Sequence, residues 1–265
     1  MTTIVKVPSI NAMDKTKGCE KAPDAILQEM DEFYSNESFL NPKFDVTEIK
    51  VDLKNLEETN NEIYKQSKKL MQEQGEQDKL IFLGGDHSIS YSLVKAFFET
   101  HENAGLLVLD AHADCMHNFH PATHEDWLRT LIENGNIKAE NVLLVGLRNL
   151  DEIEISFLNK YKVNSFSCKE IFNEGLQETT HAIMEILRKY KNLYLSLDID
   201  IADPAFAPSV SYAEPGGLTS RELIYFIQKI LLLKNLKAAD IVEVNAADDN
   251  GLTTKLAAKI AKELL

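Results

Sequence analysis

The chain has 265 residues, 44% hydrophobic and 26% charged, a composition compatible with one large or two small globular domains. Its formal net charge of −14, with no concentrated run of Lys or Arg, argues against nucleic acid and anionic membranes as partners. No apolar run approaches the roughly 18 residues that span a bilayer, the first ten residues are too short and polar for a secretory signal, and three widely spaced cysteines favour the reducing cytoplasm.

Short β-like runs alternate with helix-like segments along the whole chain. This alternation predicts an α/β fold, a parallel sheet with helices on both faces, and the lack of a linker or repeat predicts one domain over residues 1–265. We expect strands at Ile4–Val7, Val46–Val51, Lys79–Leu83, Leu106–Leu109, Val142–Val145, Val163–Phe166, Leu193–Leu197 and Ile241–Val244. We expect helices at Ala22–Tyr34, Leu56–Glu73, Ser88–His101, His124–Glu133, Ile153–Tyr161, Gln177–Tyr190, Ser220–Leu233 and Leu252–Leu265.

Polar residues cluster directly after four of the expected strands. In a parallel sheet of this kind, ligands bind outside the carboxyl ends of the strands. Because acids or imidazoles follow the carboxyl ends of four strands, we predict an active site at that edge of the sheet. The four clusters are Gly84-Gly85-Asp86-His87-Ser88, Asp110-Ala111-His112-Ala113-Asp114, Asp198-Ile199-Asp200 and Glu243-Val244-Asn245.

The cluster after Leu106–Leu109 is the densest. Polar side chains stand at every second position, Asp110, His112 and Asp114, with alanines between them. If the extended conformation persists, all three point to one side of the chain. Two bare carboxylates about 4 Å apart repel by roughly 4 kcal/mol at an effective dielectric of about 20. The triplet therefore indicates a divalent cation that uses all three groups as ligands; a polar loop is the alternative.

Two further stretches carry candidate ligands. Gly84-Gly85 allows the backbone to pass close to other groups, and His87 follows near a helix N-terminus with Ser88 as its expected cap. A structural role in that turn is the alternative for His87. Asp198 and Asp200 again lie two residues apart, on one side of an extended chain.

These candidates suit a pair of metal ions. Four carboxylates balance the charge of two divalent cations, and carboxylates with two imidazoles favour manganese over zinc, iron or cobalt. A metal pair lowers the pKa of a water held between the ions and so supplies a nucleophile near neutral pH. The implied reaction is hydrolysis at a trigonal carbon. The candidate ligands are His87, Asp110, His112, Asp114, Asp198 and Asp200.

Two other acids follow strands without a ligand triplet. Glu243 beside a metal pair is suited to hold a planar guanidinium through two parallel hydrogen bonds. A role as hydrogen-bond partner of a ligating histidine is the alternative for Glu243. Asp203 precedes a proline and fits a turn acid better than a ligand.

Five motifs carry these residues: Gly-Gly-Asp-His-Ser (84–88), Asp-Ala-His-Ala-Asp (110–114), Ser-Leu-Asp-Ile-Asp-Ile-Ala-Asp-Pro-Ala-Phe-Ala-Pro (196–208), Glu-Pro-Gly-Gly-Leu-Thr (214–219) and Glu-Val-Asn (243–245). In order and spacing they resemble the motifs of the ureohydrolases, the superfamily of arginase, agmatinase and formimidoylglutamase. The resemblance implies a three-layer α/β/α fold around a mostly parallel eight-stranded sheet. It also implies two Mn ions per subunit and a homo-oligomer, a trimer or a hexamer.

The resemblance assigns roles to the candidate residues. Glu243 matches the family's guanidinium-binding acid. The family also has a histidine, on the loop after the triplet, that relays protons; His124 matches it best, and His117 and His120 are competitors. By motif position, His87 and Asp114 would complete one metal site and His112 and Asp200 the other, with Asp110 and Asp198 as bridges.

Three departures from the family pattern concern the substrate. Glu125 replaces the usual glycine after the relay histidine, and Pro208-Ser209-Val210-Ser211 lacks a common glycine. Met116 stands where arginases have an Asn that binds the amino-acid head of the substrate. The sequence thus favours agmatine, or another small cationic guanidino compound without that head, over arginine. Asn118 and His120 remain candidates for substrate recognition.

The leading hypothesis is hydrolysis of a guanidino compound to urea and an amine. A formimidoylglutamase-type reaction on a formimino group is the alternative within the same chemistry. A deacetylase on a related fold would use one zinc, and the complete second ligand set argues against it. A non-catalytic relative is disfavoured because every ligand is present.

Overall fold

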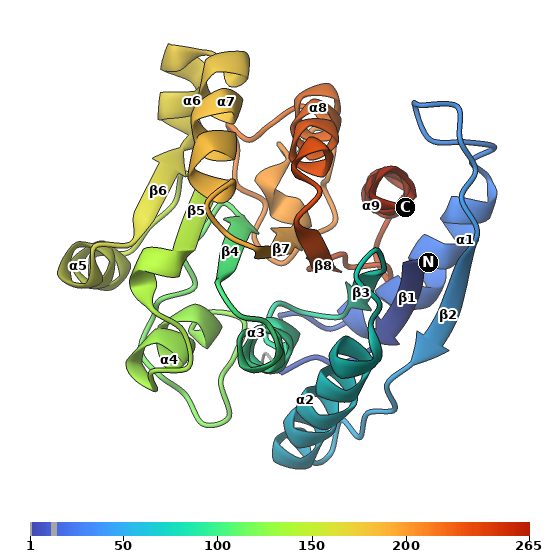
Figure 1. Ribbon diagram of the computed structural model, residues 1–265, viewed down its shortest axis with the longest axis horizontal. Helices are drawn as coiled ribbons and strands as arrows, with labels where there is room; N and C mark the ends of the chain where they lie inside the picture. The colour runs from blue at the N-terminus through green and yellow to red at the C-terminus, as the bar shows by residue number, and fades with distance from the viewer. Residues whose placement is uncertain (1, 12–14) are drawn as a thin grey trace.

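The computed structural model describes residues 2–11 and 15–265. One sheet of eight parallel strands, in the order β2-β1-β3-β8-β7-β4-β5-β6, runs through it (Figure 1). This confirms the predicted α/β fold with a parallel eight-stranded sheet. The strands are β1 (Thr2–Val7), β2 (Phe44–Glu48), β3 (Lys79–Gly84), β4 (Ala104–Leu109), β5 (Val142–Leu147), β6 (Asn164–Ser167), β7 (Asn192–Asp198) and β8 (Leu236–Val242).

Helices cover both faces of the sheet, which makes the three layers visible in Figure 1. One face is covered by α1 (Ala22–Asp31), α6 (Cys168–Glu174), α7 (Leu176–Leu187), α8 (Ser220–Ile230) and α9 (Leu252–Leu264). The other is covered by α2 (Leu56–Glu73), α3 (Ile89–Thr100), α4 (Trp127–Glu133) and α5 (Glu152–Tyr161).

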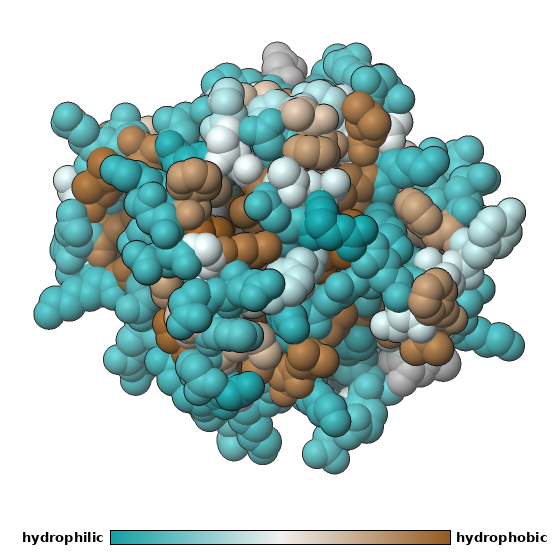
Figure 2. All heavy atoms as spheres, turned by 90° about the horizontal axis from the view of Figure 1, so that it is seen from above, coloured by the Kyte–Doolittle hydropathy of each residue, from teal (hydrophilic) through white to brown (hydrophobic). Residues whose placement is uncertain are grey.

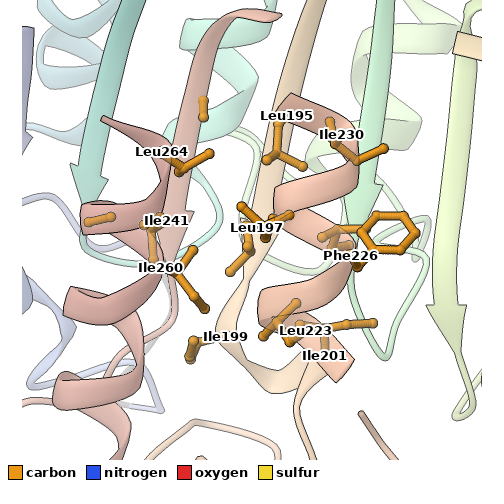
Figure 3. Packing of buried hydrophobic residues seen from close by; sticks show 14 of the residues in the cluster. Leu195, Leu197, Ile199, Ile201, Leu223, Phe226, Ile230, Ile241, Ile260 and Leu264 are labelled. Atoms are coloured by element: carbon orange, nitrogen blue, oxygen red, sulfur yellow. The ribbon is translucent and has the colours of Figure 1, made fainter. Parts of the chain in front are cut away.

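Successive residues of the central strands pack into different cores. On β4, Leu107 and Leu109 face the core under α7, α8 and α9, whereas Leu106 and Val108 face the core under α2 to α5. Burial on both sides explains why these strands are continuous apolar runs. Figure 3 shows the first core, where Leu195 and Leu197 of β7 lie against α8.

Truncation in this core is expected to be costly. Leu195 is fully buried, so Leu195→Ala should lower the free energy of unfolding by about 2–5 kcal/mol through lost apolar contact and the cavity that remains. Urea denaturation followed by circular dichroism measures the change. The control is Leu232→Ala, because Leu232 is 64% exposed and should change stability by less than about 0.5 kcal/mol. Equal effects of the two substitutions would contradict this packing.

Among the strands, the largest departure from prediction is β8, which begins at Leu236 and ends at Val242 instead of spanning 241–244. It ends there because Glu243 has a φ of 65°, a left-handed conformation incompatible with a strand. The sequence does not indicate its start, because Lys237 and Asp240 are unusual strand residues. Asp240 is nevertheless fully buried in the sheet.

Helices α1, α7 and α8 each end three residues earlier than predicted, and two other helices differ in their start or their existence. Helix α4 begins at Trp127, three residues after the predicted start, because the Asp126 carboxylate instead accepts hydrogen bonds from the Thr123 and Phe119 amides of the preceding loop. Helix α6 was not predicted. A capping box between Ser167 and Glu170 begins it.

No helix within residues 2–11 and 15–265 is both long and apolar enough to cross a membrane. Hydrophilic side chains cover most of the face seen in Figure 2, with hydrophobic side chains in patches between them.

Candidate active site and metal centre

The four strands that end in polar clusters are neighbours in the sheet. Their order is β3-β8-β7-β4, so the residues after Gly84, Val242, Asp198 and Leu109 meet at one edge. The carboxyl ends of parallel strands lie on the same side, which is why distant sequence segments converge here.

The His87 imidazole lies at the base of this edge, among three carboxylates. Its Nδ1 atom is 2.9 Å from Asp114 Oδ2, 3.2 Å from Asp110 Oδ2 and 3.4 Å from Asp198 Oδ2. His87, Asp110 and Asp198 offer ligand atoms within 4.8 Å of one another. This spacing suits one metal ion.

A second cluster shares Asp110 with the first. His112 Nδ1 lies 3.5 Å from Asp110 Oδ1 and 3.0 Å from Asp200 Oδ2. These three residues also offer ligand atoms within 4.8 Å of one another. Asp110 therefore directs one oxygen to each imidazole, as a residue between two ions would.

Tight turns, and not extended backbone, bring the acids together. Asp110 Oδ1 accepts a hydrogen bond from the His112 amide (2.6 Å), and Asp198 Oδ1 accepts one from the Asp200 amide (2.8 Å). Asp114 has a φ of 51°. The predicted convergence of the 110–114 triplet is found, but the extended chain predicted to cause it is replaced by side-chain-to-backbone turns.

Charge in the cluster favours added cations. Burial, followed by repulsion from Asp110, raises the pKa of Asp114 to about 7. Burial and carboxylate neighbours also raise the pKa of Asp198 and Asp200. Burial alone would lower the pKa of His112, but the nearby carboxylates raise it to about 12. The cluster of carboxylates thus attracts positive charge.

The donor set fits divalent metal. His87 Nδ1 and Asp110 Oδ2 are fully buried and make no hydrogen bond within the described residues, although they lie 3.2 Å apart. Two buried polar atoms without hydrogen bonds are costly unless an ion lies between them. Carboxylate oxygens and imidazole nitrogens are ligands of Mn, Fe, Co and Zn.

The turn before α3 fixes the backbone of His87. A Cβ at Gly85 would lie 1.9 Å from the Ser9 carbonyl oxygen, so only glycine fits there. Ser88 occupies the N-cap position but makes no capping bond; its hydroxyl and amide donate to Asp86 instead. Asp86 also accepts a hydrogen bond from the backbone amide of Asn11 at 2.6 Å, and this bond holds the N-terminal segment next to the site.

Glu243 lies beside the His87 cluster. Its Oε1 accepts the His87 backbone amide (2.8 Å) and its Oε2 accepts the Ser211 hydroxyl (2.9 Å). Burial, with Asp86 as the largest charge contribution, raises the Glu243 pKa to about 8. Within the described residues Glu243 accepts a hydrogen bond from the backbone of His87 and none from its ring, which disfavours the alternative of a hydrogen-bond partner for the imidazole.

A cavity of about 350 Å³ opens above the two clusters. Among the residues that line it, Met116, Leu150 and Asp151 form part of the wall, and Glu154 is buried beneath. Glu154 accepts the amides of Cys115 and Asp151, so it anchors the loop that follows the triplet.

Tyr212 forms another part of the wall. Its hydroxyl accepts from Lys15 Nζ (2.6 Å) and donates to Glu125 Oε1 (2.7 Å). Its ring stacks on His124 with centroids 5.9 Å apart and meets the His112 ring edge-on. Sequence reasoning missed Tyr212, because a tyrosine in a loop carries no signal that it lines a cavity.

His124 lines the cavity and has neither ring nitrogen hydrogen-bonded within the described residues. It is 9% exposed, and burial lowers its pKa, so the imidazole is neutral near pH 7. Glu125 Oε1 lies 3.8 Å from His124 Nε2, beyond hydrogen-bond distance. The histidine predicted as the proton relay therefore lies in the cavity wall, and neither of its ring nitrogens is hydrogen-bonded to a described residue.

Other predicted residues lie elsewhere. Asn118 and His120, the candidates for substrate recognition, are not among the cavity-lining residues. The Asn118 side chain instead donates to Glu133 at 2.7 Å and accepts from Thr130. Asp203 accepts the amides of Ala205 and Gly216, which confirms the turn role expected of it.

Trp127 was also missed in the sequence. Its indole Nε1 donates to Asp114 Oδ2 at 2.6 Å, and its ring lies 4.8 Å from the His87 ring centroid. Trp127 therefore orients one carboxylate and packs against the neighbouring imidazole. The period of the surrounding helix indicates only that Trp127 is buried.

The chain matches one family model over most of its length. The model described as "Arginase family" matches residues 2–265. The arginase of Staphylococcus aureus (strain MRSA252) is 32% identical over 185 residues, which cover 64% of this chain and 61% of that protein, less than two thirds of its length. The arginase of Schizosaccharomyces pombe is 26% identical over 297 residues, which cover 99% of this chain and 90% of the relative.

Solved structures show the same fold. The formimidoylglutamase of Bacillus subtilis superposes with a TM-score of 0.90 and 24% sequence identity, covering 99% of this chain and 85% of that one. At this identity the likeness concerns the fold alone.

Proposed function

The chain belongs to the arginase family of hydrolases, and from that premise we propose that it uses two Mn ions to hydrolyse a guanidino compound to urea and an amine. We propose the whole chain, residues 1–265, as a single catalytic domain. The observation that carries the proposal is the pair of ligand clusters that share Asp110 beneath a cavity containing Glu243.

Each ion has its own imidazole in this proposal. When bound, the metal pair supplies an activated water and positive charge for the tetrahedral intermediate. One ion would be held by His87 and Asp114 and the other by His112 and Asp200, with Asp110 and Asp198 shared between them.

Glu243 would bind the guanidinium. Its two oxygens each accept one hydrogen bond from the protein, and each keeps a lone pair for an N–H of the substrate. A guanidinium presents two parallel N–H groups that match a carboxylate. Its positive charge also favours the ionised form of Glu243 over the neutral one.

His124 would handle the protons. A water oxygen adds to the guanidino carbon, the bond from that carbon to the alkyl-bearing nitrogen breaks, and this nitrogen takes a proton as it leaves. A neutral, buried imidazole with two unbonded nitrogens can accept that proton from the water and deliver it to the amine.

The cavity wall favours a substrate without a carboxylate at its far end. No Lys or Arg is among the described residues that line the cavity, whereas Glu125 and Asp151 are. An acidic wall attracts a distal ammonium and repels a carboxylate. We therefore favour agmatine or a similar guanidine over arginine.

Glu243→Gln should weaken substrate binding and leave both metals in place. Gln keeps the shape of the side chain and removes its charge, which costs about 1.5–3 kcal/mol per charged hydrogen bond, or about 10–150-fold in kcat/KM. Urea release and metal analysis measure the two effects. The control is Glu170→Gln on α6, which begins a helix away from the cavity. Unchanged kcat and KM in Glu243→Gln would remove Glu243 from the site.

The proposal is tested by a substrate screen of Mn-loaded protein. Urea release is measured with agmatine, arginine, guanidinobutyrate and guanidine, and formamide release with formimidoylglutamate. We expect urea from agmatine at a higher kcat/KM than from arginine. Formamide without urea would favour the formimino alternative, and no product from any of them would overturn the proposed activity.

We also propose that the protein acts in the cytoplasm as a homo-oligomer, a trimer or a hexamer. All three cysteines are buried free thiols, as suits a reducing compartment. Large hydrophobic side chains such as Phe172 (87% exposed) are available for contacts between subunits. Light scattering of the purified chain measures the assembly directly.

A further inference from the structure

The second nitrogen of the His87 ring enters a buried chain of hydrogen bonds. His87 Nε2 lies 2.9 Å from the Ser196 hydroxyl, and that hydroxyl donates to Asp240 Oδ1 at 2.8 Å. Each of the three residues is at most 1% exposed. Ser196 on β7 and Asp240 on β8 are register partners of adjacent parallel strands, so the sheet itself holds this pair together.

The direction of the chain follows from the surroundings of Asp240. Its Oδ2 accepts the hydroxyls of Ser90 and Tyr194, both at 2.8 Å, and its Oδ1 also accepts the Leu197 amide. With donors on both oxygens, Asp240 acts as an acceptor. A serine hydroxyl has one proton, and Ser196 donates it in a hydrogen bond to Asp240. A lone pair of the Ser196 oxygen is then left to accept a hydrogen bond from His87 Nε2–H.

This arrangement decides which nitrogen is available for metal. A proton on Nε2 leaves the lone pair of a neutral imidazole on Nδ1. Nδ1 is the atom that faces Asp110, Asp114 and Asp198 and makes no hydrogen bond within the described part of the chain. The protonated side is thus fixed by the sheet, and the ligating side points at the carboxylates.

His112 has no comparable hydrogen-bond partner for its Nε2 atom within the described residues. Its Nε2 lies 3.8 Å from Glu214 Oε1, too far for a hydrogen bond, and this glutamate oxygen already accepts from Asn149. His112 is also more exposed than His87, with 19% of its side chain accessible against 1%.

We propose that Ser196 and Asp240 are positioning residues for the metal ion at His87, which hold its imidazole in the Nε2–H tautomer with Nδ1 directed at the ion. The proposal rests on the proposed metal centre. A carboxylate buried in the middle of a strand is costly even when hydrogen-bonded. A role in orienting a metal ligand explains why the Asp240 carboxylate lies inside the sheet.

Ser196→Ala tests the proposal. It removes one hydroxyl and leaves the carboxylates of the site untouched. Orienting partners of ligating histidines typically contribute about 10–100-fold to metal affinity, so the affinity for one of the two Mn ions should fall by that factor. Titration of metal-free full-length protein with Mn²⁺, with free Mn²⁺ followed by electron paramagnetic resonance, measures both affinities. Asp240→Asn, which removes the charge at the end of the chain, should lower the same affinity.

The matched control is Tyr194→Phe. It deletes another buried hydroxyl that donates to Asp240 and leaves Ser196 and His87 paired. If the Asp240 cluster serves only the stability of the sheet, all three variants lower the unfolding temperature and none changes metal affinity. We expect Tyr194→Phe to bind Mn²⁺ within about twofold of the parent protein. Parent-like affinities in Ser196→Ala would overturn the proposal.

A second measurement reports on the tautomer and does not depend on turnover. In zinc-loaded protein, ¹⁵N-resolved NMR should show a slowly exchanging His87 Nε2 proton, which Ser196→Ala exposes to rapid exchange. A proton on Nδ1 would overturn the proposal. The positioning role and the proposed reaction can also be separated. If the parent protein binds metal but releases no urea, and Ser196→Ala binds metal about 10–100-fold more weakly, the positioning role is supported and the proposed reaction is rejected.

Discussion

Asp110→Asn is expected to reduce urea release to background and to lower the Mn content of the protein. Asp110 is the residue common to both ligand clusters, with Oδ2 3.2 Å from His87 Nδ1 and Oδ1 3.5 Å from His112 Nδ1. Asn preserves the shape of the side chain but carries no charge, so it cannot balance two cations. Loss of this one carboxylate should therefore affect both ions.

Metal analysis by mass spectrometry after Mn loading and desalting, together with the urea assay, measures the two effects. The control is Asp45→Asn on the edge strand β2, where the side chain is exposed and distant in sheet order from the clusters. Circular dichroism of both variants checks that the fold persists. Full activity or a full complement of Mn in Asp110→Asn would refute the shared position of this residue.

His124→Asn is expected to lower kcat by about 10²–10⁴-fold, the usual contribution of a positioned acid–base group. Neither ring nitrogen of His124 contacts the carboxylates of the metal clusters, so Mn content and KM should change little. Steady-state kinetics with the best substrate of the screen, at saturating Mn²⁺, separates these quantities.

The controls for His124 are two histidines on the same loop. His117 and His120 are the other candidates for the proton-relay histidine in the sequence, but they are not among the residues that line the cavity. His117→Asn and His120→Asn should therefore keep kcat within about twofold of the parent. If kcat falls strongly in either of these variants and stays unchanged in His124→Asn, the assignment of the proton relay to His124 is wrong.

Much of the fold could be predicted because burial on both faces leaves a clear pattern in the sequence. The run Leu106–Leu109 has no polar residue, as expected of a central parallel strand. Strand β8 was placed poorly because Asp240 interrupts its pattern, and four hydrogen bonds from residues far away in the chain make that acid tolerable. Such tertiary compensation leaves no local trace.

In the site, too, some residues could be predicted from local sequence and others depend on contacts between distant segments. The six ligand candidates could be identified because acids and imidazoles at strand ends have few structural uses, and the structure brings all six together. Their adjacency depends on the strand order β3-β8-β7-β4, which the sequence does not encode locally. The wall was largely unpredictable, because Tyr212 reaches it through contacts with Lys15 and Glu125, residues far away along the chain.

Anomalous diffraction from crystals of the Mn-loaded protein tests the central claim most directly, namely that side chains from separate strand ends hold two cations together. The account predicts two manganese peaks per chain, one next to His87 and one next to His112, with Asp110 in contact with both. A single peak per chain, as in a one-metal deacetylase, or no peak at these residues would contradict it.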